Sequence, residues 1–369
     1  MAQRRALIVH SVYRNRGGEE RMVDLECGAL QQAGYKTLLL TRGPEEGSSL
    51  RSKAMLAVGL VAPGAASHAL ERALREEDPE FVHFHNLLPH WGFASLQKAL
   101  DWGLRKGRKV ATTIHNQRWI CANGLFWRDG AHCQKCLDQQ NPLWGAVHVC
   151  RGNLPESTAY ASALTWAWTR NLYNHPGHTL IALNETTAVR LRRHFPCATV
   201  VVLPNPVPLP SQQSLPRQLP AAWSGQRLAV VGRLSAEKGI SRLISEIRWG
   251  RVGADGTSAN PALDPHTQFV IAGDGPLKEL VEAEARTNPR VLYLGQLPEE
   301  EVPGLMAACG GVFHGSLVEE QSPTALRLAA CLGHGVWSWE GRLKAQDLKR
   351  WGAILDVAPW REELLRILR

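Results

Sequence analysis

The chain has 369 residues, of which 44% are hydrophobic and 21% charged, with 33 glycines and 22 prolines scattered along it. This composition excludes a fibrous, wholly disordered or small disulfide-framework protein, and the length predicts about two domains. The first residues contain only a short hydrophobic run, and the apolar stretch 55–66 is interrupted by Pro63 and too short to span a bilayer. We therefore expect a cytoplasmic protein.

Charge is distributed unevenly along the chain. The formal net charge is +8, from 42 Lys and Arg against 34 Asp and Glu. Residues 1–203 contain 24 basic and 16 acidic residues, whereas residues 204–369 contain 18 of each. The first half therefore suits an anionic partner, for which a lipid phosphate at a membrane surface, a nucleic acid and a merely soluble basic surface are the alternatives.

Short apolar runs alternate with longer amphipathic segments from the start of the chain. The predicted strands of the first half are residues 6–9, 37–40, 81–84, 110–114, 179–182 and 200–203. Helical spacing is clearest in residues 19–33 and 157–173. This alternation is typical of parallel βαβ units, and it predicts an open, Rossmann-like α/β domain.

A proline-rich segment separates the two halves. Six prolines lie between Pro204 and Pro220, so residues 204–224 are predicted to be a linker. The second half then repeats the pattern, with strands at 228–231, 269–271, 291–294 and 312–313 and helices near 240–249, 277–286, 299–308 and 323–332. Residues 1–203 and 225–369 are therefore predicted to form two domains that face a cleft, with ligands at the carboxyl ends of the strands.

Four loops join a predicted strand to a predicted helix, where free backbone N–H groups favour anions. They are residues 15–18, 232–239, 273–276 and 319–324. Glycines let the backbone approach a ligand, and basic side chains add charge, so the loops suit a diphosphate. The candidate donor-binding residues are Gly17, Gly18, Arg233, Lys238, Gly273, Gly275, Ser322, Pro323 and Thr324. Taken singly, each loop also fits an ordinary glycine turn or helix cap.

The fourth loop adds an acid to these candidates. Ser322 is predicted to cap a helix that Pro323 opens, which leaves Thr324 and backbone N–H groups for a phosphate. Glu320 is placed to accept hydrogen bonds from sugar hydroxyls. The chain contains no Gly-x-Gly-x-x-Gly, no Gly-x-x-x-x-Gly-Lys-Ser/Thr and no Asp-x-Asp. This disfavours a nicotinamide dehydrogenase or an ATPase, and it leaves Arg233, Lys238 and helix dipoles, rather than a divalent metal, to neutralise a diphosphate.

In combination, these motifs resemble a known family. Residues 232–239, 271–276 and 320–323 resemble the donor half of family-4 retaining glycosyltransferases of the GT-B fold, which has two Rossmann-like domains. In the first half, Gly17-Gly18-Glu19, His85-Asn86 and residues 113–118, 121–124 and 182–185 resemble the bacterial polysaccharide-biosynthesis branch of that family.

The resemblance implies transfer of a sugar from a nucleotide-diphosphate donor to a lipid-linked or oligosaccharide acceptor, with retained anomeric configuration and no metal or other cofactor needed for catalysis. Arg233 and Lys238 would bind the diphosphate, with Gly17 and Gly18, and Glu320 would hold sugar hydroxyls. An anionic membrane surface is an expected partner and a nucleic acid is not, so the protein would lie in the cytoplasm or on the inner face of the membrane.

The same resemblance supplies candidate acceptor-side residues. His115 and Glu320 are the candidate catalytic residues: His115, at the end of a strand of the acceptor-side domain, would lie near the reacting carbon, and the alternative is a histidine at a strand end that bonds to a neighbouring carbonyl. The acceptor-side candidates are His85, Asn86, Arg118 and Glu185.

Two departures from the family pattern keep other functions open. The family has a second acid eight positions after the first, but that position is Leu328 counted from Glu320 and Arg327 counted from Glu319, so the acid is absent in either register. The alternatives are therefore a catalytically weakened sugar-nucleotide binder, or a nucleotide-sugar epimerase or hydrolase. In addition, the last residues are predicted to complete the second domain, with no helix that crosses back to the first.

Four of the eight cysteines are grouped in a tryptophan-containing insertion at residues 119–150. Their pattern contains Cys-x-x-Cys, which in a cytosolic protein favours a tetrahedral structural zinc over disulfides. Buried free thiols and a redox pair are the competing interpretations. The candidate ligands are Cys121, Cys133, Cys136 and Cys150.

Overall fold

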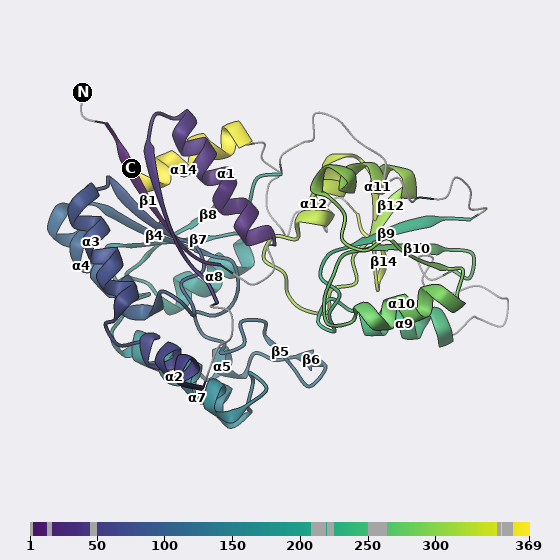
Figure 1. Cartoon of the computed structure of the whole chain (residues 1–369), viewed down its shortest axis with the longest axis horizontal. Coiled ribbons are helices and arrows are strands. Elements are labelled where there is room, and N and C mark those ends of the chain that lie inside the picture. Colours follow the sequence, from purple (N-terminus) through teal and green to yellow (C-terminus); the bar gives the residue numbers. More distant parts are fainter. Residues whose placement is uncertain are drawn as a thin grey trace. The chain divides into compact units, whose positions relative to one another are not determined.

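The computed structural model describes residues 3–12, 17–44, 50–207, 219, 225–249, 264–344, 348 and 357–369. These residues form two compact α/β units (Figure 1). The first contains most of the described chain up to residue 206 together with the C-terminal helix, and the second contains most of residues 207–350. The predicted linker, residues 204–224, lies mostly outside the described residues.

The first unit is built on a six-stranded parallel sheet with the order β2-β1-β3-β4-β7-β8. Its strands are β1 (Arg5–Ser11), β2 (Lys36–Arg42), β3 (Phe81–Phe84), β4 (Lys109–Ile114), β7 (His178–Ala182) and β8 (Thr199–Val202). All six overlap predicted strands. The strand order reverses between β1 and β3, and open parallel sheets bind ligands beyond the carboxyl ends of the strands at such a point.

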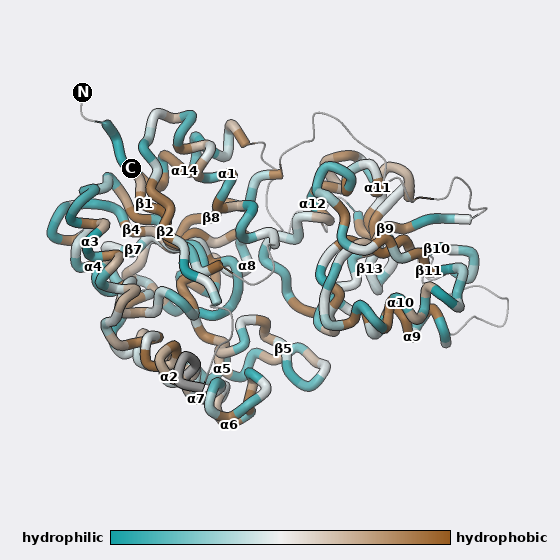
Figure 2. Tube along the Cα trace, in the orientation of Figure 1, coloured by the Kyte–Doolittle hydropathy of each residue, from teal (hydrophilic) through white to brown (hydrophobic). Residues whose placement is uncertain are grey.

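Alternate residues of β1 enter different cores, as the period of a strand requires. Leu7 and Val9 belong to one buried cluster, and Ala6 and Ile8 belong to another. Figure 2 shows the hydrophobic residues gathered along the central strands. The helices of this unit are α1 (Gly18–Gln32), α2 (Leu50–Gly59), α3 (Ala65–Glu77), α4 (Gly92–Lys106), α7 (Leu154–Thr169), α8 (Glu185–His194) and α14 (Val357–Leu368).

The second unit has a six-stranded sheet with the order β11-β10-β9-β12-β13-β14. Its strands are β9 (Arg227–Val231), β10 (Gln268–Ala272), β11 (Val291–Tyr293), β12 (Gly311–Phe313), β13 (Gly335–Ser338) and β14 (Gly341–Arg342). Its helices are α9 (Ile240–Trp249), α10 (Lys278–Thr287), the 3-10 turn η2 (Glu299–Glu301), α11 (Val302–Cys309) and α12 (Thr324–Cys331). Only β14 pairs antiparallel among these strands, and the strand order reverses between β9 and β12.

The C-terminal helix corrects one sequence prediction. The sequence predicts that residues 357–369 belong to the second domain, but α14 packs against α1 of the first unit (Figure 1). Trp360, Leu364 and Leu368 are buried in the cluster that contains Ile8, and Arg361 donates to Gln32 at 3.0 Å. The prediction failed because an apolar helical stripe shows that a helix must cover a sheet but does not show which sheet.

The insertion at residues 119–150 contains the hairpin of β5 (Trp127–Arg128) and β6 (Ala131–His132), followed by α5 (Lys135–Asp138) and α6 (Trp144–Val147). Among the described residues, no helix has the length and apolar character needed to cross a membrane.

Candidate active site

In the second unit, the loops that follow β9 and β12 meet at the point where the strand order reverses. Leu317 N donates to Glu237 O at 2.9 Å, which ties the two loops together. Lys238 Nζ lies 2.7 Å from Glu320 Oε1, and His314 Nε2 lies 3.9 Å from the same oxygen. The structure therefore brings together two residues that the sequence placed in separate loops, a cation for a phosphate and an acid for hydroxyls.

The Glu320 carboxylate is ionised at neutral pH. Burial alone would raise its pKa, but the positive charge of Lys238 and the neighbouring His314 lower that pKa to about 2. Its side chain is 15% exposed and that of Lys238 is 34% exposed, so both groups remain accessible to a ligand. Arg233, from the same loop as Lys238, is exposed and forms no ion pair with any residue that the structure describes.

The glycines of the third loop allow that loop to pack directly on the second. A Cβ added at Gly273 would lie 1.9 Å from Gly232 O, and one at Gly275 would lie 2.5 Å from Leu234 O. Leu234 N also donates to Asp274 O at 2.9 Å. Gly273 and Gly275 therefore allow the third loop to pack on the loop after β9. Their role in donor binding stays a prediction.

The fourth loop differs from its prediction at the helix start. Helix α12 begins at Thr324, and Pro323 occupies the N-cap position without a side-chain cap. The predicted Ser322 cap is therefore wrong. Ser322 Oγ instead accepts a hydrogen bond from Arg327, at 2.8 Å from Nη1, and burial lowers the pKa of this guanidinium to about 10. Sequence analysis missed this contact because a serine before a proline more often caps a helix.

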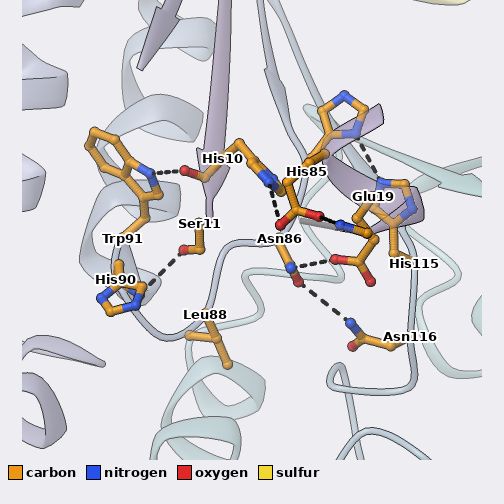
Figure 3. Close-up of polar contacts among 12 residues, drawn as sticks. His10, Ser11, Glu19, His85, Asn86, Leu88, His90, Trp91, His115 and Asn116 are labelled. Atoms are coloured by element: carbon orange, nitrogen blue, oxygen red, sulfur yellow. Dashed lines mark hydrogen bonds and ion pairs between the residues drawn. The ribbon is translucent and has the colours of Figure 1, made fainter. Parts of the chain in front are cut away.

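In the first unit, a polar cluster lies beyond the carboxyl ends of β1, β3 and β4. Ser11 N donates to Asn86 O at 2.9 Å, so the ends of β1 and β3 are joined. The Asn86 amide donates to Glu19, in the first turn of α1, and accepts from Asn116 Nδ2 at 3.5 Å. Figure 3 shows this chain of side chains beside the pair of His85 and His115. The structure therefore brings together the predicted catalytic residue His115 and two predicted acceptor-side residues, His85 and Asn86.

His115 is bonded to another histidine. His85 Nδ1 lies 2.9 Å from His115 Nε2, and the two rings stack with centroids 5.2 Å apart. The alternative of a bond to a neighbouring carbonyl is therefore not what the structure shows. Burial, together with nearby histidines, lowers the pKa of His115 well below its ordinary value and that of His85 to about 4. Both rings are neutral at pH 7.

The start of α1 carries its own acids. Gly17 N donates to Glu20 Oε2 at 2.8 Å, and Glu19 and Glu20 occupy the first turn, where acids stabilise a helix. The Glu20 carboxylate would have to turn away before this amide could bind a phosphate. The predicted contacts of Gly17 and Gly18 with a diphosphate stay predictions, and residues 15–16 of the same loop lie outside the described residues.

A pocket of about 40 Å³ lies beside His115, with Asn86, Asn116 and Arg118 in its lining. This volume holds a few water molecules or a hydroxyl group. Arg118 donates its backbone N–H to Asn116 Oδ1 at 3.1 Å. Glu185 lies apart from these contacts, because its exposed carboxylate pairs with Arg192 at 2.5 Å on the surface of α8.

Glu19 is the acid of this cluster that sequence analysis did not select as a site residue. Burial and the negative charge of Glu20 raise its pKa to about 6, although Arg118 opposes the shift. The unfolded chain binds this proton less tightly, so stability is lost as the pH rises from about 4.5, the ordinary pKa of a glutamate, through about 6, and the penalty is complete at higher pH.

Glu19→Gln is therefore expected to raise the free energy of unfolding by about 1 to 2 kcal/mol at pH 8 and to leave it unchanged near pH 4. Chemical denaturation at both pH values measures the difference. Destabilisation by this substitution at pH 8 would show that the Arg118 interaction outweighs the cost of burial.

The four cysteines of the insertion lie near one another. Cys121 and Cys136 are buried in one cluster, and Cys150 N donates to Gly145 O at 3.0 Å. Burial and the neighbouring thiols of the other three raise the pKa of Cys136 to about 12. Among the described residues, the group of candidate ligands whose atoms all lie within 4.8 Å is instead Glu26, His83 and His85. The zinc site at the cysteines stays a prediction.

The comparisons with known proteins agree with this architecture. Residues 16–210 match the sequence profile of Glycosyltransferase Family 4, so the chain belongs to that family. A 2-deoxystreptamine N-acetyl-D-glucosaminyltransferase from Streptomyces fradiae is 30% identical over 162 residues, which cover 40% of this chain and 36% of that protein. The match thus spans little more than a third of the relative.

The fold is also similar to that of solved structures. WaaG, a glycosyltransferase involved in lipopolysaccharide biosynthesis, aligns with a TM-score of 0.53 at 14% identity, over 99% of this chain and 90% of that one. A UDP co-structure of S. aureus MnaA aligns with a TM-score of 0.48 at 10% identity, over 98% and 89% of the two chains. The two Rossmann-like domains are those of the GT-B fold, as the sequence predicted.

Proposed function

We propose that this protein transfers a hexosyl group from a nucleoside-diphosphate sugar to a hydroxyl acceptor, with retention of anomeric configuration and without a catalytic metal. The observation that carries the proposal is the contact of Lys238 with Glu320 at 2.7 Å, at the reversal point of the second sheet, in a chain of glycosyltransferase family 4.

The chemistry of the pair fits the two halves of such a donor. In the ligand-free protein each group neutralises the other. When a donor binds, Lys238 and Arg233 would stabilise the charge of the diphosphate leaving group, while Glu320 would accept hydrogen bonds from the sugar hydroxyls. His115 and its neighbours would contact the acceptor side of the reaction.

The proposed acceptor is a lipid-linked or saccharide molecule in polysaccharide biosynthesis, used at the inner face of the membrane. The basic excess of residues 1–203, 24 basic against 16 acidic residues, supports an acceptor with a phosphate. The Streptomyces relative is named an N-acetyl-D-glucosaminyltransferase, which makes N-acetylglucosamine the first donor sugar to test.

A thermal-shift screen against uridine, guanosine and adenosine diphosphates and their sugars tests the donor. A ligand at a hundred times its Kd stabilises the folded protein by about 2.7 kcal/mol, so we expect a clear rise in melting temperature with one base. No shift with any nucleotide, at millimolar concentration, would contradict the proposal.

Leu328 supports a second candidate, a weakened sugar-nucleotide binder. This side chain, at the position of the family's second acid, is 7% exposed. Leu328→Glu is expected to destabilise the fold by about 1 to 3 kcal/mol without improving donor affinity, if the site is adapted to leucine. Calorimetric titration with the donor measures this affinity. A tenfold or larger gain would identify a decayed site, and release of free or epimerised sugar without acceptor would identify a hydrolase or epimerase.

A further inference from the structure

A buried carboxylate lies behind the histidine pair of the first unit. Glu26, on α1, is fully buried, and each of its oxygens meets a different histidine of β3 or its end. Oε1 lies 2.6 Å from His83 Nδ1, and Oε2 lies 2.8 Å from His85 Nε2. The other side of each ring is also occupied, since His83 Nε2 lies 2.8 Å from Thr113 Oγ1 and His85 Nδ1 lies 2.9 Å from His115 Nε2.

These contacts determine where the protons lie. Burial opposes charge on Glu26, but the two histidines lower its pKa below the ordinary value, so the carboxylate is ionised and only accepts hydrogen bonds. His85 must therefore carry its proton on Nε2, which faces Glu26. Because burial lowers the pKa of His85 to about 4, its ring holds a single proton at pH 7 and Nδ1 is an acceptor.

The next bond in the chain follows from this assignment. An unprotonated Nδ1 on His85 can only accept, so the 2.9 Å contact requires that His115 donates from Nε2. The neutral His115 ring then has Nδ1 as its one acceptor. We propose that Glu26 is a positioning residue that acts through His85 to hold His115 in the Nε2-protonated tautomer, with Nδ1 able to accept a hydrogen bond from a substrate hydroxyl.

This inference deepens the proposed function and rests on it for the identity of the substrate, a hydroxyl-bearing sugar or its acceptor. The pocket beside His115 has room for such a hydroxyl, and Asn86 and Asn116 supply further polar groups there. The tautomer of His115 can be measured without any activity. A test of the tautomer and a test of sugar transfer can therefore fail independently.

A metal ion is the competing explanation for Glu26, His83 and His85, whose ligand atoms all lie within 4.8 Å. Ligands at adjacent positions around zinc, each about 2.1 Å from the ion, are separated by about 3 Å or more. The observed contacts of 2.6 and 2.8 Å are those of direct hydrogen bonds. Metal analysis of the purified protein is therefore included in the test.

The primary experiment is nitrogen-15 NMR of the histidine rings in the full-length protein at pH 7.5, with His115 assigned through His115→Asn. We expect His115 to be a single neutral tautomer with its proton on Nε2. In Glu26→Gln the carboxamide can donate as well as accept, so His115 should become a mixture or invert to the Nδ1-protonated form. A wild-type ring protonated on Nδ1, or an unchanged ring in Glu26→Gln, would overturn the inference.

If Glu26→Gln does not fold, the wild-type spectrum alone still tests the inference, because a His115 ring protonated on Nδ1 would overturn it. A bound metal at one ion per chain that is lost in Glu26→Gln would also overturn the inference, in favour of a metal site.

The second experiment measures activity. Glu26→Gln should lower kcat about tenfold or more with the donor KM unchanged. Glu71→Gln, which removes an exposed partner of Lys98, is the control and should leave kcat unchanged.

The two arms separate the two proposals. The expected tautomers with no transferase activity in the wild-type protein would overturn the proposed function and leave the positioning inference standing. Activity with kcat unaffected by Glu26→Gln would overturn the positioning role.

Discussion

Glu320→Gln is expected to lower kcat/KM for sugar transfer by about 10- to 100-fold while the protein remains folded. The carboxylate accepts charge-assisted hydrogen bonds in the proposed donor complex, and each such bond contributes about 1.5 to 3 kcal/mol. Lys238→Met is expected to have an effect of similar size. Steady-state kinetics with the donor identified by the nucleotide screen measure both.

The double variant Lys238→Met/Glu320→Gln tests whether the two residues act at one site. Because Lys238 Nζ and Glu320 Oε1 are 2.7 Å apart, the two substitutions should be less than additive, with a coupling energy of about 0.5 to 3 kcal/mol. Lys278→Met is the matched control, since Lys278 pairs with Glu282 at 3.8 Å on the surface of α10. If Lys278→Met lowered kcat/KM as much as Lys238→Met does, or if the effects of Lys238→Met and Glu320→Gln were fully additive, a shared role at one site would be contradicted.

Gly239→Ala is expected to destabilise the second unit by about 3 kcal/mol or more. Gly239 has φ +77°, and a Cβ there would lie 1.9 Å from Gly315 O, in the loop after β12. The substitution therefore combines left-handed backbone strain with a collision against backbone that carries the loop of Glu320. Hydrogen exchange measured by mass spectrometry over peptides of the second unit reports the loss of protection.

Gly310→Ala separates the two causes. Gly310 has φ +68° and no atom within 4 Å of an added Cβ, so only the backbone strain applies, at about 1 to 2 kcal/mol. A Gly239→Ala variant no less stable than Gly310→Ala would show that the two loops do not pack as the structure places them.

The strands could be predicted from sequence because their signal is local. Runs such as Ala6–Val9 are apolar and buried on both faces of the sheet, so neighbouring residues alone indicate a strand. The position of α14 could not be predicted, because it depends on which sheet has an uncovered apolar face. Neither could the Ser322 contact with Arg327, which joins side chains five positions apart through the local fold of a loop.

The candidate site was predictable in part for the same reason. Loop motifs selected Lys238 and Glu320, which lie in the loops after β9 and β12, and the family resemblance selected His85 and His115, which directly follow β3 and β4. Glu26 and His83 were missed because they lie within a helix and a strand, where a polar residue carries no motif. Two features of the sequence could have indicated the pair: an acid on the apolar face of α1 and a histidine inside an apolar strand. Because buried charges in proteins are paired, these two residues would be expected to contact each other.

Hydrogen exchange with and without the donor nucleotide is the most direct test of the central claim, that the loops after β9 and β12 bind a nucleoside diphosphate. We predict that saturating nucleotide slows exchange in residues 232–239 and 314–323, and that Lys238→Met abolishes this protection. Slowed exchange only outside these two loops, with nucleotide bound, would contradict the account.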